Sequence, residues 1–231
     1  MADEPTSASH RVRVWDLPIR AFHILLTLTV IGSVVSAKVG GNAMVWHIRF
    51  GLFVMALLAF RLVWGFVGGR WSRFAAFVYA PRALIDYLRG GSDPDGRWTV
   101  GHSPLGALAV FALLGLLALQ VATGLVADDE IATTGPLNRF VPSVFGLQAT
   151  AWHKTGGQYL IYVVVAAHIG AVFYYLRRKG IDLMQPMWDG DKTGLPVATP
   201  ASADGVRERL FALALALATL VAAWWVGRLG G

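Results

Sequence analysis

The residues best placed to do chemistry are four histidines in long apolar stretches, His23, His47, His153 and His168. His153 and His168 are fifteen residues apart in one such stretch, which on a helix is about 22 Å along the axis. At roughly 100° per residue the two rings lie about 60° apart around that helix, so they share one broad face. One helix with an imidazole near each end could hold two prosthetic groups at different depths if other helices supply partner rings.

The chain has the composition of a membrane protein. Its 231 residues are 55% hydrophobic and 15% charged, whereas a soluble domain of this length is more polar. Absence of cysteine excludes disulfides, iron–sulfur clusters and thiolate ligation of a haem. Apolar segments long enough to span a membrane cover residues 21–39, 46–66, 103–126, 152–176 and, more briefly, 210–226.

The loops between these segments predict the orientation of the chain. Most Lys and Arg residues outside the spans fall on the side of the N-terminus, which favours a cytoplasmic N-terminus and accounts for the net charge of +6 without nucleic acid. Helix direction then places His23 and His168 near the cytoplasmic side, and His47 and His153 near the outer side. The four histidines therefore form two pairs matched in depth.

Such pairs are suited to haem ligation. A histidine within a span is costly and tends to be functional, although a single one often only bonds to a neighbouring backbone. Imidazoles from two facing helices can take both axial positions of a haem iron, which leaves no open position for substrate and favours electron transfer. Gly51, Gly156 and Gly157, each about one turn after a histidine, are expected to leave room for a porphyrin.

Polar residues near the pairs are candidates for contacts with cofactors. The candidates for haem propionates are Arg20, Arg49, Arg61 and Lys154. The alternative for each of these is ordinary snorkelling to lipid headgroups. His102 and Gln120 are candidates for contacts with a quinone, with helix capping and a helix–helix hydrogen bond as their respective alternatives. The pattern assigns no residue a catalytic role.

The remaining segments have simpler predicted roles. Residues 1–11 form a polar tail, and Asp16 before Pro18 predicts the start of the first helix. Residues 81–89 predict an amphipathic helix on the membrane surface, and residues 127–150 an outer loop. Residues 193–207 predict a flexible cytoplasmic linker to an additional transmembrane helix within residues 208–231, which carries no ligand side chain.

A series of motifs, in order between residues 12 and 192, carries a family resemblance. They are Val14-Trp15-Asp16-Leu17-Pro18, Trp46-His47, Arg61-Leu62-Val63-Trp64-Gly65, Gly101-His102-Ser103-Pro104, Gly135-Pro136-Leu137, Trp152-His153 and Met187-Trp188. The series resembles the bacterial cytochrome b561 family, which includes the b-type cytochrome subunit of nickel–iron hydrogenases; Ser103 stands where that family usually has Asn. The resemblance implies a four-helix domain over residues 12–192 that binds two haem b groups. It also implies ligands from the first, second and fourth helices, at the four histidines.

The residues and the resemblance together predict an all-α integral membrane protein: a four-helix transmembrane bundle holding two haems, plus an additional C-terminal transmembrane helix. We expect it in the bacterial inner membrane, transferring electrons between the quinone pool and a periplasmic c-type cytochrome, dehydrogenase or hydrogenase. Three alternatives stay open: a stand-alone quinone oxidoreductase that uses a small reductant such as superoxide, a transporter with histidine proton relays, and a structural anchor. Pairing of two copies of the chain also stays open.

Overall fold

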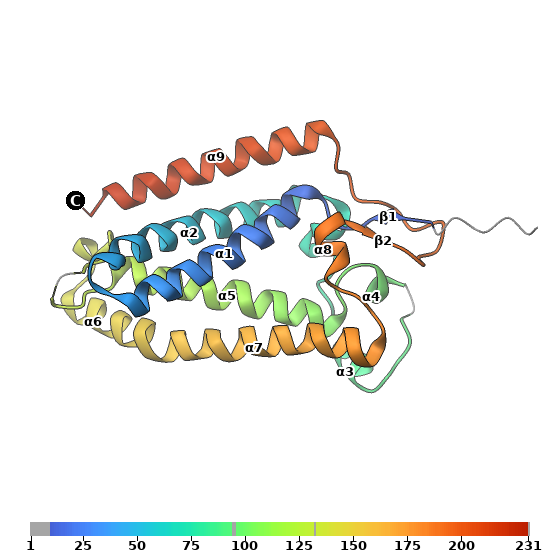
Figure 1. Cartoon of the computed structure of the whole chain (residues 1–231), viewed down its shortest axis with the longest axis horizontal. Helices are drawn as coiled ribbons and strands as arrows, with labels where there is room; N and C mark the ends of the chain where they lie inside the picture. Colours follow the sequence, from blue (N-terminus) through green and yellow to red (C-terminus); the bar gives the residue numbers. More distant parts are fainter. Residues whose placement is uncertain (1–9, 94–95, 132, 231) are drawn as a thin grey trace, which may run out of the picture.

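The computed structural model describes residues 10–93, 96–131 and 133–230. Five of its helices are long and apolar enough to cross a membrane, which confirms the predicted all-helical membrane fold. Figure 1 shows them running lengthwise, with the last helix, α9, along one side of the others. The long helices are α1 (Leu17–Val39), α2 (Met44–Val67), α5 (Pro104–Val126), the run from α6 (Ser143–Trp152) to α7 (Gln158–Tyr174), and α9 (Val206–Arg228).

Short elements join the long helices. Strand β1 (Val12–Arg13) pairs antiparallel with β2 (Asp191–Lys192), with Val12 opposite Lys192. The amphipathic segment predicted near residue 81 is helix α3 (Pro81–Leu88). The other short helices are α4 (Arg97–Val100) and α8 (Gln185–Asp189). The 3-10 turns are η1 (Gly41–Ala43), η2 (Arg70–Ser72), η3 (Phe74–Ala76) and η4 (Asn138–Phe140). The π-helical turns are η5 (His153–Gly157) and η6 (Tyr175–Lys179).

The fourth long helix starts at Ser143, inside the segment predicted to be an outer loop. Pro142 ends the preceding chain, and its carbonyl accepts from the amides of Phe145 and Gly146. Thr150 ties the new turns to the loop, because its hydroxyl bonds to both the amide and the carbonyl of Asp128 at 2.8 Å. The run Ser143–Lys179 has 37 residues and a length of about 55 Å, so it exceeds a bilayer core of about 30 Å.

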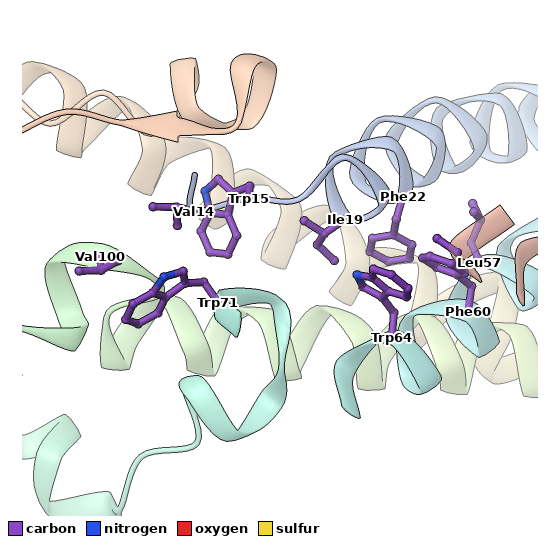
Figure 2. Packing of buried hydrophobic residues seen from close by; sticks show 10 residues of the cluster. Val14, Trp15, Ile19, Phe22, Leu57, Phe60, Trp64, Trp71 and Val100 are labelled. Atoms are coloured by element: carbon purple, nitrogen blue, oxygen red, sulfur yellow. The ribbon is translucent and has the colours of Figure 1, made fainter. Parts of the chain in front are cut away.

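A cluster of aromatic and aliphatic side chains closes the bundle at the end that holds both strands. Figure 2 shows Trp15, Phe22, Phe60 and Trp64 in this cluster, with Trp71 from the turn after α2. Asp16 lies fully buried beside it and caps α1 by accepting from the Ile19 amide at 2.9 Å. The predicted start of the first helix is therefore confirmed.

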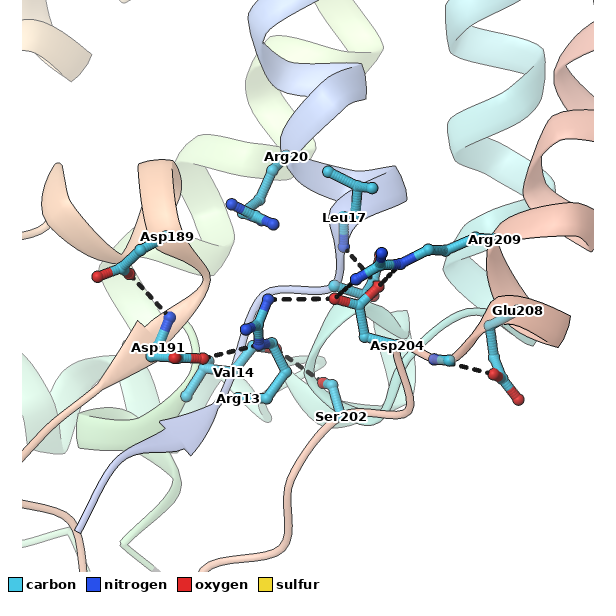
Figure 3. A network of polar contacts seen from close by, with 12 residues as sticks. Arg13, Val14, Leu17, Arg20, Asp189, Asp191, Ser202, Asp204, Glu208 and Arg209 are labelled. Atoms are coloured by element: carbon cyan, nitrogen blue, oxygen red, sulfur yellow. Dashed lines mark hydrogen bonds and ion pairs between the residues drawn. The ribbon is translucent and has the colours of Figure 1, made fainter.

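Residues 200–204, within the segment predicted to be a flexible linker, are held against the bundle, which corrects the expectation of flexibility for this part. Ser202 donates through its hydroxyl to the carbonyl of Val14 at 2.7 Å, and the carbonyl of Pro200 accepts from the Trp71 indole at 2.8 Å. Asp204 accepts from the Leu17 amide at 3.0 Å and pairs with Arg13 and Arg209 (Figure 3). Proline and glycine content suggested flexibility, but the partners that hold this segment lie far away in sequence.

We expect Asp204→Asn to loosen the start of α9 and to lower the free energy of unfolding by about 1–3 kcal/mol at neutral pH. Burial raises the pKa of Asp204, but hydrogen bonds from Arg209 and Leu17 and the charge of Arg13 outweigh it, so the pKa lies below its usual range. The stabilisation is therefore present above the unfolded-state pKa and is lost as the pH falls through the folded-state pKa.

Denaturation of the detergent-solubilised protein between pH 3 and 7, followed by helical circular dichroism, measures this effect. The variant should lose less stability than the wild type on acidification. Asp189→Asn is the control for a more exposed ion pair, because the Asp189 side chain is 33% exposed, against 7% for that of Asp204. An Asp204→Asn variant as stable as the control would contradict the prediction.

Candidate functional site

The four histidines of the sequence analysis meet in two pairs inside the helical bundle. The rings of His23 on α1 and His168 on α7 have centroids 6.5 Å apart. The rings of His47 on α2 and His153 in η5 have centroids 5.8 Å apart. The structure thus brings together the same partners that helix direction predicts. His153 lies well inside its helical run, because that run starts at Ser143.

Both separations suit a metal ion held between the two rings. Two metal–nitrogen bonds of about 2 Å each, with the radii of two imidazoles added, place the centroids roughly 6 Å apart. Within the part of the chain that the structure describes, no group of three or more His, Cys, Asp or Glu side chains could hold a metal ion. A metal ion between either pair would therefore need further ligands from a non-protein group, and a porphyrin supplies four.

Backbone carbonyls orient the outer pair. His47 donates through Nδ1 to the carbonyl of Ser33 at 2.9 Å. His153 donates through Nδ1 to the carbonyl of Gln120, also at 2.9 Å. A ring whose Nδ1 carries the proton keeps Nε2 free as a ligand, and this kind of support is usual around metal-bound histidines.

A cavity of about 510 Å³ lies beside the outer pair, and its size is typical of a cofactor pocket. His47, His153, Lys38, Lys154 and Gln120 are among the residues that line it. This cavity and the donor set on its wall fit a large planar group with an imidazole on each face.

The glycines that make room in the outer cavity differ in part from the predicted ones. Gly51 borders the cavity, and a Cβ there would meet no atom within 4 Å. Gly156 and Gly157 instead pack against Trp152 and Gln120, so they do not open the cavity as predicted. Gly124 on α5 lies against His153, where a Cβ would come within 2.8 Å of Cε1. Its position one turn after Gln120 was the available sequence signal for this role.

Arg61 and His102 each lie near the ring of Phe77, and each has a buried nitrogen without a partner among the described residues. Arg61 is only 3% exposed, its guanidinium lies 4.6 Å from the ring centroid of Phe74, and its buried Nη1 has no partner among the described residues. The His102 ring lies 4.4 Å from that of Phe77, and its Nδ1 is likewise buried without a partner there. Burial, with the charges of Arg61 and Lys192 added, lowers the pKa of His102 to about 3, so this imidazole is neutral.

The other predicted contact residues have distinct surroundings. Arg20 donates to the carbonyl of Trp188, and its buried Nε has no partner in the described part of the chain. Lys154 lines the outer cavity, whereas Arg49 lies over the ring of Trp46 at 4.9 Å. Gln120 makes the predicted alternative, a helix–helix hydrogen bond, by donating to the carbonyl of His153 at 2.8 Å.

Comparison with known protein families finds a match. The family model described as prokaryotic cytochrome b561 matches residues 14–190. This range includes all four paired histidines and ends before α9. Comparisons with curated proteins and with solved structures find no match.

Proposed function

The chain belongs to the prokaryotic cytochrome b561 family and is therefore a multi-pass membrane b-type cytochrome of electron transfer, and we propose that it binds two haem b groups. The proposal is carried by the two histidine pairs near opposite ends of the bundle. The ring centroids are 6.5 Å apart in the pair of His23 and His168 and 5.8 Å apart in the pair of His47 and His153. In this proposal His23 and His168 ligate the inner haem. His47 and His153 ligate the outer haem.

The chain's own residues position these ligands. A haem held between the two histidines of a pair would supply reversible one-electron chemistry. The carbonyls of Ser33 and Gln120 hold the outer rings with Nε2 free. The fourth long helix contributes one ligand to each site, His153 and His168, so its rise of about 22 Å between them sets the spacing of the two sites.

Basic residues complete the proposed sites at their edges. At the inner end Arg20 and Arg61 each keep a buried nitrogen without a partner in the described residues, which a propionate would satisfy. At the outer end Lys154 takes this role from the wall of the cavity. We leave Arg49 out of the set, because it packs on Trp46 at the start of α2.

We further propose that the protein lies in the bacterial inner membrane with its N-terminus in the cytoplasm. The excess of basic residues on that side supports this orientation. Electrons then pass between membrane quinone and a periplasmic partner, a c-type cytochrome or a dehydrogenase or hydrogenase. Both candidates for a quinone contact keep a buried polar atom without a partner among the described residues, Nδ1 of His102 and Oε1 of Gln120, although Nε2 of Gln120 already supports His153.

The full chain, purified from membranes, tests the proposal through its haem-to-protein ratio and a redox titration. We expect two haem b groups per chain and two separate one-electron steps, because the two sites differ in their surroundings. A ratio of one would remove one of the two pairs from the proposal. A protein without a reduced b-type absorption band would contradict the proposal entirely.

A further inference from the structure

Helix α9 lies outside the residues that match the family and presents no ligand side chain. Figure 1 shows it extended along α2, with its C-terminal end close to the loop between α5 and α6. Small residues face the bundle on this helix, where Ala212 and Ala223 are buried. Its N-terminal end is tied down through Asp204, as described above.

The C-terminal end of α9 is fixed by three contacts at the outer end of the bundle. A Cβ on Gly227 would lie 2.7 Å from Cδ1 of Leu52, so α9 approaches α2 closely there. A Cβ on Gly230 would lie 2.6 Å from Cα of Pro136 in the outer loop. Arg139 of the same loop donates from its guanidinium to the carbonyl of Leu229 at 3.2 Å.

Two of the residues that α9 contacts also form the wall of the outer cavity. Leu52 follows Gly51 on α2, Pro136 lies in the loop between α5 and α6, and both residues line the cavity. Close-packed protein transmits small displacements, because few voids exist to absorb them. A displacement of α9 by about the width of a methyl group therefore moves the cavity wall beside His47 and His153.

We propose that α9 is a brace that positions the wall of the outer haem site, through Gly227 against Leu52 and through Leu229 and Gly230 against the outer loop. The inference rests on the proposed function, since it assumes a haem between His47 and His153. Burial and solvent access around a haem set its reduction potential. The outer haem's potential and its retention therefore depend on α9, although α9 contributes no ligand.

Gly227→Leu in the full chain tests the brace, because the new side chain must displace Leu52. We expect a shift in the midpoint potential of the outer haem and faster loss of that haem in detergent, with the inner haem unchanged. The double variant Gly227→Leu with Leu52→Ala restores the space and should return the outer potential toward the wild-type value. Gly115→Leu on α5 is the matched control, because a Cβ at Gly115 meets no atom within 4 Å.

Gly230→Leu gives a second probe, since its side chain presses on the backbone of Pro136 from the exposed position just after α9. It should shift the same outer signal even if Gly227→Leu does not fold. An outer potential unchanged in both variants, or changed equally by Gly115→Leu, would overturn the brace and leave the dihaem proposal intact. A wild-type protein with no haem signal that depends on His47 and His153 would overturn both.

Discussion

Replacing His168 with alanine should remove the inner haem and leave the outer haem spectrum in place. In the proposed arrangement the change leaves His23 as the one remaining histidine of the inner pair, and a single imidazole would hold the haem more weakly than two. The haem-to-protein ratio should fall by about half, and one of the two steps in the redox titration should disappear. Pyridine haemochrome analysis and a redox titration of the purified variant measure both effects.

His153→Ala is the complementary change and should remove the outer haem only. His10→Ala serves as a control for the loss of a histidine, because His10 is exposed and lies before the first strand. The two ligand variants should affect different redox steps, since the fourth long helix gives one ring to each site. Loss of the same signal in both variants, or full haem content in either, would contradict the assignment of ligands.

Replacing Asp16 with alanine should destabilise the protein by about 3–5 kcal/mol, because it removes the acceptor of three buried hydrogen bonds. The carboxylate is fully buried and joins three elements at the inner end of the bundle. It accepts from the Ile19 amide at 2.9 Å, from the Trp64 indole at 3.0 Å and from the Ser72 hydroxyl. Alanine leaves all three donors buried without a partner, and each unsatisfied donor costs about 1–3 kcal/mol.

The variant Asp16→Asn separates this network from simple loss of packing. Asparagine keeps one acceptor oxygen for the Ile19 and Trp64 donors, so it should cost less than alanine. Denaturation of the detergent-solubilised protein by added SDS, followed by circular dichroism, compares the two variants. Equal stability of wild type and Asp16→Ala would show that these hydrogen bonds contribute nothing to folding.

The difference in stability between the wild type and Asp16→Asn should change with pH in a definite direction. Burial raises the pKa of Asp16, and its three hydrogen bonds offset this only in part. The folded state therefore favours the protonated acid, so the contribution from its titration is full below the unfolded-state pKa and is lost as the pH rises through the folded-state pKa. The stability of the wild type relative to Asp16→Asn should decrease over that range, with the Asp204 contribution common to both proteins.

The amino-acid sequence by itself determined the membrane class and the pairing of the histidines. Apolar segments of sufficient length form helices in a bilayer, because every backbone polar group must be satisfied within the segment. Alternating helix direction then ranks side chains by depth, so His47 falls level with His153 and His23 with His168. Asp16 before Pro18 also marked the start of α1, because capping depends on residues within one turn.

Only the tertiary structure decided the features that depend on partners far apart in the chain. The fourth long helix begins at Ser143 partly because Thr150 bonds to Asp128, and residues 200–204 are ordered because Val14, Leu17 and Trp71 hold them. The glycine against the outer histidine is Gly124, and its contact with His153 depends on how α5 packs against η5. The contact of α9 with Leu52 and Pro136 is of the same kind. Local sequence determines where a helix forms and how deep its side chains lie, whereas packing between helices determines which faces meet.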